Sequence, residues 1–253
     1  MAPILKVENL TKTFARAGQK DVAAVKGISF SLEPGEILGI IGESGSGKTT
    51  AVNMIARLLD PTEGHIYLDG QEITAFKGKQ LRQAYRTMQM VFQTPVESFD
   101  SRKTLGDGIG ESLRNAGLSG QQTRERVETL LVRCGLPKEF ACRYPHQVSG
   151  GQCQRAAIAR ALAIEPKLLI CDEATSALDV TVQKEIIDLL NDLRAAQKDL
   201  SILFICHDIS LVQSFCHRVL VMYRGEIVEE GTPDEVIGHP KNEYTKRLVD
   251  SVL

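Results

Sequence analysis

The sequence has no apolar run of the roughly 20 residues that a membrane-spanning helix needs. Residues 1–14 also lack a charged segment followed by an apolar core, so a secretory leader is not expected. Internal repeats and low-complexity segments are absent as well. Any role at a membrane is therefore expected to be a peripheral one.

Basic runs of the kind that grip a phosphodiester backbone are also missing. The 30 Lys and Arg residues are outnumbered by 32 Asp and Glu residues, which gives a formal net charge of −2 and a pI of about 6.2. A nucleic-acid-binding domain is normally marked by a clustered excess of positive charge. Nucleic acid is therefore not expected as the main partner.

The chain has six cysteines, but no two of them form a C-x-x-C pair. Cys171 and Cys206 lie inside apolar runs, where a free cysteine behaves as a small hydrophobic residue. We therefore expect reduced thiols, as is usual in a cytosolic protein. A redox switch is the alternative that the residues leave open.

Strand-like and helix-like segments alternate along most of the 253 residues. Alternating apolar and polar residues predict strands at 4–9 and 23–32. Apolar runs at 37–41 and 168–172 predict strands that are buried on both faces, and 86–93 is also predicted as a buried strand. Because helices connect these strands, the sequence predicts an α/β fold with a mainly parallel sheet.

The middle of the chain differs, because glycines and prolines separate short helical segments there. We predict one domain with a core at 1–94 and 149–232 and a helical subdomain at about 95–148. A C-terminal tail at 233–253 is expected to hold two short helices.

A glycine-rich segment after the predicted strand 37–41 fits the pattern G-x-x-x-x-G-K-[ST] at every fixed position. Its residues are Gly42, Glu43, Ser44, Gly45, Ser46, Gly47, Lys48 and Thr49. Glycines let successive N–H groups point at phosphate oxygens, and the following helix adds the positive end of its dipole. Lys48 can reach the β- and γ-phosphates, and the Thr49 hydroxyl can ligate Mg2+. The sequence therefore predicts a binding site for ATP and Mg2+. The ATP-binding residues are expected to include Thr50 as well.

A second apolar run, 168–171, ends in Asp172 and Glu173. Two carboxylates at the C-terminal end of a strand, in a sheet that also carries a phosphate loop, suit the handling of Mg2+ and water. We expect Asp172 to hold the metal ion, directly or through water, and Glu173 to polarise the attacking water. Two exposed carboxylates that simply end a strand are the alternative interpretation.

Residues 148–152, Val-Ser-Gly-Gly-Gln, closely resemble the L-S-G-G-Q signature of ABC (ATP-binding cassette) ATPases, with Val at the first position. Other elements of that family follow in the expected order. They are Phe14 as the aromatic that stacks on adenine, Gln93 as the Q-loop glutamine, 176–179 as the D-loop and His207 as the switch histidine. The resemblance covers essentially the whole chain. It implies a P-loop NTPase core with a mainly parallel sheet, an N-terminal antiparallel β subdomain and an inserted helical subdomain.

The resemblance also implies a head-to-tail dimer, in which the phosphate loop of one subunit and the signature of the other enclose each ATP. The signature residues that would contact the nucleotide of the second subunit are Ser149, Gly150, Gly151 and Gln152. The implied catalytic residues are Glu173, His207 and Gln93, and the implied metal ligands are Thr49, Gln93 and Asp172. The chain is thus expected to bind and hydrolyse ATP.

Within this family, several segments resemble the oligopeptide, dipeptide and nickel importer ATPases. Residues 89–95 and 98–102 are similar to their Q-loop region, 179–183 follow their D-loop, and 239–248 match their H-P-x-x-x-Y-T-x-x-L ending. At 100–101 the usual Asn-Pro is Asp-Ser, so the contacts of that loop with a membrane subunit are expected to differ. Longer relatives continue into a cysteine-containing extension. None follows here, so no iron–sulfur cluster is predicted.

The importer resemblance implies a peripheral position at the cytoplasmic face of the cell membrane, with several partner chains. These are a second ABC ATPase (identical or paralogous), two transmembrane permease subunits and an extracytoplasmic substrate-binding protein. The sequence leaves open whether the cargo is a peptide, nickel or a metal chelate, and whether both ATP sites are active. The alternatives are a non-transport ABC ATPase that acts on nucleic acid or ribosomes, and a degenerate cassette that binds ATP without hydrolysis.

Overall fold

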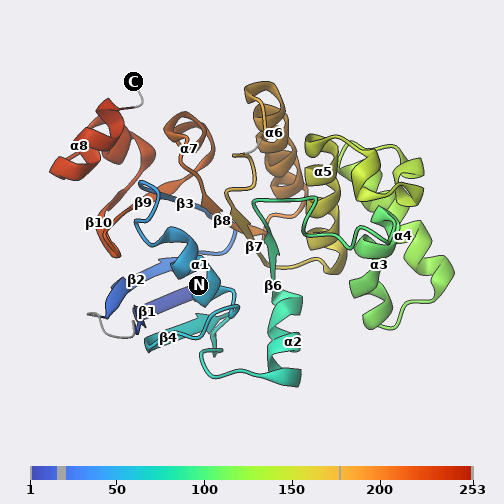
Figure 1. Cartoon of the computed structure of the whole chain (residues 1–253), viewed down its shortest axis with the longest axis horizontal. Coiled ribbons are helices and arrows are strands. Elements are labelled where there is room, and N and C mark those ends of the chain that lie inside the picture. The colour runs from blue at the N-terminus through green and yellow to red at the C-terminus, as the bar shows by residue number, and fades with distance from the viewer. Residues whose placement is uncertain (1, 16–20, 177, 252–253) are drawn as a thin grey trace.

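The structure, a computed structural model of the chain, describes residues 2–15, 21–176 and 178–251. It contains two sheets and the helices that pack against them (Figure 1). The first sheet is antiparallel and has the strand order β2-β1-β4-β5. Its strands are β1 (Leu5–Phe14), β2 (Val22–Leu32), β4 (Glu63–Leu68) and β5 (Gln71–Glu72).

The second sheet has the strand order β10-β9-β3-β8-β7-β6. Its parallel strands are β3 (Ile37–Ile41), β6 (Met88–Val91), β7 (Leu168–Asp172), β8 (Ser201–Ile205) and β9 (Arg218–Tyr223). The edge strand β10 (Glu226–Gly231) pairs with β9 in the antiparallel direction. The predicted α/β fold, with a mainly parallel sheet and an N-terminal antiparallel sheet, is confirmed.

The central strands of this sheet are buried on both faces, which explains their continuous apolar runs. In β3, Ile37 and Ile41 belong to one apolar cluster, whereas Leu38 and Ile40 belong to the other. Successive side chains of a strand point to opposite faces, so each run serves both clusters. Helices α6 (Val180–Ala196) and α7 (Ile209–Phe215) contribute to the first cluster, and α1 (Lys48–Ile55) with the antiparallel sheet contributes to the second (Figure 1).

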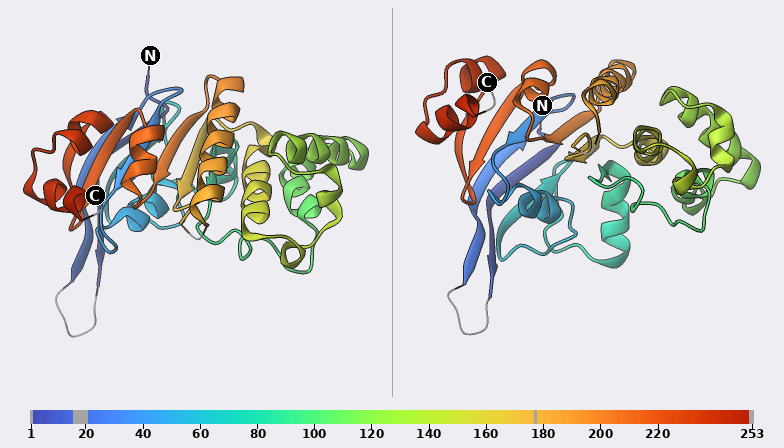
Figure 2. Two further views of the ribbon diagram at one scale, coloured as in Figure 1. Left: turned by 90° about the horizontal axis from the view of Figure 1, so that it is seen from above. Right: turned by 45° about the horizontal axis from the view of Figure 1, so that its top comes forward.

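A group of helices forms one end of the molecule (Figure 2). It contains α3 (Leu105–Asn115), α4 (Gly120–Arg133), α5 (Gly150–Ala161), η1 (Lys138–Cys142), η2 (Pro145–Gln147) and η3 (Leu162–Ile164). Helices α3, α4 and α5 each begin with a capping box, whose N-cap residues are Thr104, Ser119 and Ser149. These reciprocal bonds satisfy N–H groups that a helix start otherwise leaves free, so each helix begins at a defined residue.

The predicted strand at 86–93 is wrong in its extent. Helix α2 (Gly78–Thr87) occupies the start of that segment, and β6 begins only at Met88. Ala84 is the one buried residue of α2. Leu81, Ala84, Tyr85 and Met88 nevertheless recur at helical spacing and are buried or half-buried, a periodicity that indicates a helix and that the strand prediction does not take into account.

The tail lies beyond β10 at the end of the molecule opposite α3 and α4 (Figure 1). It contains the π-helical turn η4 (Asp234–Gly238) and helix α8 (Glu243–Asp250). Val236, Ile237, Tyr244, Leu248 and Val249 are buried there. None of the helices in the described part of the chain is both long and apolar enough to cross a membrane.

Candidate functional site

The phosphate loop connects β3 to α1, and its glycines have backbone angles that other residues rarely adopt. Gly42, Gly45 and Gly47 have φ values of 146°, 79° and 106°. A Cβ atom at Gly42 would lie 2.2 Å from the carbonyl oxygen of Met222, and one at Gly47 would lie 2.5 Å from that of Ala24. Both positions therefore require glycine for space as well as for conformation.

Lys48 is almost completely buried and folds back onto this loop. Its ammonium group donates hydrogen bonds to the carbonyl oxygens of Gly42 at 2.6 Å and Glu43 at 2.9 Å. Burial lowers the pKa of Lys48, while the nearby carboxylates of Glu173 and Asp172 raise it. The positive charge thus lies between the loop and the two carboxylates that the sequence singled out.

Asp172 ends β7, with 7% of its surface exposed, and its Oδ1 atom is buried without a hydrogen-bond partner in the described structure. The pKa of Asp172 is raised to about 6, mainly by burial and to a smaller extent by repulsion from the Glu173 carboxylate. A buried oxygen without a partner costs free energy, and a cation beside it would offset that cost. The Asp172 carboxylate therefore suits a Mg2+ ion, because Mg2+ prefers oxygen ligands. Thr49, at the exposed start of α1, and Gln93 offer further oxygens.

Gln93 and Glu173 are brought into contact from segments 80 residues apart. The Gln93 Nε2 atom donates to Glu173 Oε2 at 2.8 Å and to the Ser176 hydroxyl at 3.4 Å. Glu173 itself has a positive φ of 47°, and its N–H donates to the Ile205 carbonyl at 3.0 Å. The backbone turn after β7 thereby directs Glu173 toward the loop that contains Gln93.

His207 is exposed in the bend between β8 and α7. Because Asp172 on β7 pairs with Ile205 on β8, Glu173 and His207 follow their strands at the same edge of the sheet. Asp208, the next residue, caps α7 by accepting hydrogen bonds from Ser210 and Leu211.

The signature residues start α5, among the helices at the far end of the molecule from α8 (Figure 1). Ser149 and Gln152 form the capping box of α5: the Ser149 N–H donates to Gln152 Oε1 at 2.9 Å, and the Gln152 N–H donates to the Ser149 hydroxyl at 3.3 Å. Gly150 is exposed in the first turn, and Gly151 packs against Val182. The start of α5 is thus capped by its own side chains, and Ser149 and Gly150 are exposed to solvent.

Phe14 ends β1 with 41% of its surface exposed, and the Lys12 ammonium lies 5.3 Å from the centre of its ring. Within the described residues, no hydrogen bond or ion pair joins Phe14, His207 or 149–152 to the phosphate loop. The D-loop contributes Ser176 to the contact with Gln93, whereas its Ala177 lies outside the described residues.

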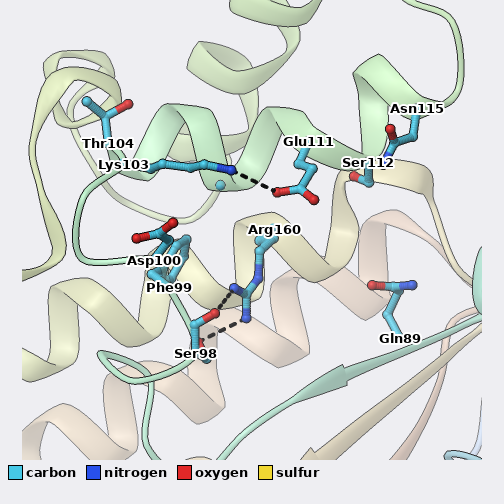
Figure 3. Close-up of a pocket in the computed structure, with 11 residues that line it drawn as sticks. Gln89, Ser98, Phe99, Asp100, Lys103, Thr104, Glu111, Ser112, Asn115 and Arg160 are labelled. Carbon is cyan, nitrogen blue, oxygen red and sulfur yellow. Dashed lines mark hydrogen bonds and ion pairs between the residues drawn. The ribbon is translucent and has the colours of Figure 1, made fainter.

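A cavity of about 310 Å³ lies between the segment after Gln93 and helices α3 and α5 (Figure 3). Arg160 donates hydrogen bonds to the Ser98 hydroxyl and carbonyl and lies 4.3 Å from the centre of the Phe99 ring. Asp100, which stands in place of the asparagine of the importer pattern, accepts hydrogen bonds from Arg102. This pairing, together with the backbone N–H of Arg102, lowers the pKa of Asp100 to about 2.

Two further residues contact the predicted site, although the sequence gives neither of them an individual role. Ser176 belongs to the D-loop motif, and Tyr244 belongs to the H-P-x-x-x-Y-T ending. Tyr244 accepts a hydrogen bond from the N–H of Glu43 at 2.9 Å, across 201 positions of sequence. No local pattern signals such contacts, because they depend on how the sheet brings distant segments together.

Comparisons with known proteins agree with these features. Residues 25–176 match the family model described as "ABC transporter" (ABC_tran). The chain is 46% identical to the glutathione import ATP-binding protein GsiA of Escherichia coli K12, over 99% of this chain and 41% of that protein. It is 45% identical to the oligopeptide transport ATP-binding protein OppF of the same strain, over 92% of this chain and 70% of OppF. The chain thus spans less than half the length of its GsiA relatives.

Two solved structures are similar to the whole cassette. One is the ATP-binding cassette MJ0796, a dimer in a post-hydrolysis state with ADP and Pi, with a TM-score of 0.83, 32% identity, and coverage of 90% of this chain and 98% of that chain. The other is cbiO1 of Clostridium perfringens, part of the transporter complex cbiONQ, with a TM-score of 0.83, 31% identity, and coverage of 99% and 96%. Together with the family match, the likeness shows that this chain belongs to the ABC transporter family.

Proposed function

We propose that the chain binds MgATP and hydrolyses it as one of two ATPase subunits that drive a peptide importer. The observation that carries the proposal is the meeting of Lys48, Asp172, Glu173 and Gln93 beside the phosphate loop. A buried ammonium, an unpartnered carboxylate oxygen and a second carboxylate held by an amide are the groups that phosphoryl transfer to water requires.

The loop amides and Lys48 bind the phosphates of ATP. Lys48 exchanges its present carbonyl partners for phosphate oxygens, which accept stronger, charge-assisted hydrogen bonds. Asp172, Thr49 and Gln93 would hold the Mg2+ ion. When bound, Mg2+ neutralises charge on the phosphate oxygens.

Glu173 acts as the general base. Its Oε2 atom accepts a hydrogen bond from Gln93, which leaves Oε1 free to accept a proton from the attacking water. His207 is directed at the γ-phosphate from the same sheet edge, where it stabilises the charge that develops there. Phe14, exposed at the end of β1, provides the surface on which adenine stacks.

Each ATP site is completed by a second ATPase subunit. The exposed first turn of α5 offers free N–H groups and the positive end of the helix dipole, which suit the γ-phosphate of a nucleotide bound to the partner. The dimer of MJ0796 with ADP and Pi supports this arrangement by similarity. The partner is a second copy of this chain or a paralogue.

The names of GsiA and OppF support glutathione or a longer peptide as the imported cargo, and none of the relatives compared supports nickel. We therefore place the chain at the cytoplasmic face of a membrane, with two permease subunits and a substrate-binding protein. The cavity of Figure 3, lined by Ser98, Asp100, Lys103 and Glu111, is the surface that we assign to a permease contact.

Replacement of Gly150 by Asp tests the shared site. The variant is expected to lower ATP turnover by the assembled transporter at least tenfold, because a carboxylate at that position repels the partner's γ-phosphate. The ATP affinity of the isolated chain is expected to stay within about twofold of wild type, because Gly150 lies in α5 and is not part of the phosphate loop of the same chain. Turnover is measured on the purified complex and affinity by calorimetry.

Gly120→Asp is the matched control, because Gly120 also follows the N-cap serine of a capping box, at the start of α4. An acidic residue in the first turn suits either helix, so neither variant is expected to unfold. Normal turnover with Gly150→Asp, or loss of ATP binding by the isolated variant, would contradict the shared site.

A further inference from the structure

The C-terminal helix α8 is connected directly to the phosphate loop. Tyr244, in the first turn of α8, is only 4% exposed. Its hydroxyl oxygen accepts a hydrogen bond from the backbone N–H of Glu43, the second residue of the loop, at 2.9 Å. Burial raises the pKa of Tyr244, so the phenol stays neutral at physiological pH.

The same residue, Glu43, also contacts the lysine of the site. Its carbonyl oxygen accepts a hydrogen bond from the Lys48 ammonium at 2.9 Å. The backbone of Glu43 therefore contacts both residues: its N–H group bonds to the Tyr244 hydroxyl, and its carbonyl bonds to the Lys48 ammonium. A shift of Glu43 would change the position of the carbonyl that holds Lys48.

The ring of Tyr244 is held in place from several sides. It stacks on Tyr223 of β9 with ring centres 4.0 Å apart and an interplanar angle of 25°. Asn242 caps α8 by accepting the Tyr244 N–H at 2.8 Å. The N–H groups of Lys241 and Asn242 donate to the carboxylate of Glu229 on β10, at 2.8 and 3.1 Å. The hydroxyl thus has a fixed position relative to the sheet.

A second contact supports the loop further along. The Gly225 N–H, in the turn between β9 and β10, donates to the Ser46 carbonyl at 2.8 Å. The loop is therefore held at Glu43 and at Ser46 by groups that belong neither to β3 nor to α1. Fixing a loop before its ligand arrives lowers the entropy cost of binding.

We propose, on the basis of the function proposed above, that Tyr244 is a positioning residue that holds the phosphate loop ready for ATP. The tyrosine of the tail motif therefore sets the affinity for nucleotide without touching it. The alternative is that Tyr244 only fills the apolar space between α8 and β9. The two roles separate in a phenylalanine variant, which keeps the stacked ring and loses the hydroxyl.

Tyr244→Phe is expected to raise the Kd for MgATP about three- to tenfold, the effect of losing one hydrogen bond to the loop. The KM of hydrolysis is expected to rise by the same factor, while kcat at saturating ATP stays within about twofold. Calorimetry on the full chain gives Kd, steady-state kinetics on the assembled complex gives KM and kcat, and thermal unfolding without nucleotide monitors the fold. Tyr223→Phe is the matched control, because it removes the neighbouring hydroxyl and leaves the bond to Glu43 intact.

A Kd for Tyr244→Phe equal to that of wild type, with or without a lower melting temperature, would overturn the positioning role and leave the proposed function standing. A wild-type chain without measurable ATP affinity would overturn the proposed function itself. If Tyr244→Phe does not fold, Glu229→Gln tests the same connection through the other anchor of the tail. That variant is expected to raise Kd about twofold or more, and an unchanged Kd would overturn the proposal.

Discussion

Replacement of Glu173 by Gln is expected to lower ATP turnover by the assembled transporter at least a hundredfold, since a general base contributes about 10²–10⁴-fold to rate. The glutamine side chain has the same size as glutamate and still lies beside Gln93, but its amide cannot accept a proton from water. ATP affinity is expected to stay within about twofold, because Lys48 and the loop amides are unchanged. Turnover is measured as phosphate release at saturating ATP, and affinity by calorimetry.

Glu63→Gln, at an exposed position of β4, makes the same chemical change away from the site and serves as its control. Near-normal turnover by Glu173→Gln would defeat the assignment of the base. A loss of ATP binding that matches the loss of turnover would also count against it, because it would place Glu173 in binding rather than in proton transfer.

Replacement of Lys48 by Ala is expected to act on binding, and to raise the Kd for ATP at least tenfold. A hydrogen bond to a charged group is worth about 1.5–3 kcal/mol, which corresponds to a change in Kd of one to two powers of ten. The variant also removes the positive charge that lowers the pKa of Asp172, so that carboxyl is expected to hold its proton more strongly and to bind Mg2+ less well. Calorimetry with MgATP measures the combined effect.

Lys79→Ala, on the exposed side of α2, is the matched control, and its ATP affinity is expected to equal that of wild type. Unchanged affinity in Lys48→Ala would show that the lysine does not contact the phosphates. It would remove the main support for the ATP site as described.

The parts of the site that lie in one stretch of chain are predictable from the sequence. The phosphate loop is one, because Gly42 and Gly47 must be glycine for both angle and space, which leaves a fixed pattern in the sequence. Asp172 and Glu173 are another, because a buried strand that ends in two carboxylates is visible as an apolar run followed by acid. Their individual roles remain predictions that the variants above test.

The contacts between distant segments are not predictable in this way. Gln93 meets Glu173 because β6 and β7 are neighbours in the sheet, and Tyr244 meets Glu43 because α8 packs beside β9. Neither contact leaves a periodic signal in the sequence. Helix α2, by contrast, is predictable from local sequence, because Leu81, Ala84 and Tyr85 recur at helical spacing and form its buried or half-buried side.

We propose that this chain supplies ATP-derived energy to membrane partners that import peptides. The most direct test is to purify the tagged chain from detergent-solubilised membranes of its own cells and to identify the chains that stay bound. We expect two polytopic permease subunits and an ATPase partner, in a complex whose hydrolysis of ATP the Glu173→Gln variant abolishes. Retention of ribosomal proteins or nucleic acid, without any polytopic membrane protein, would contradict the proposed role in peptide import.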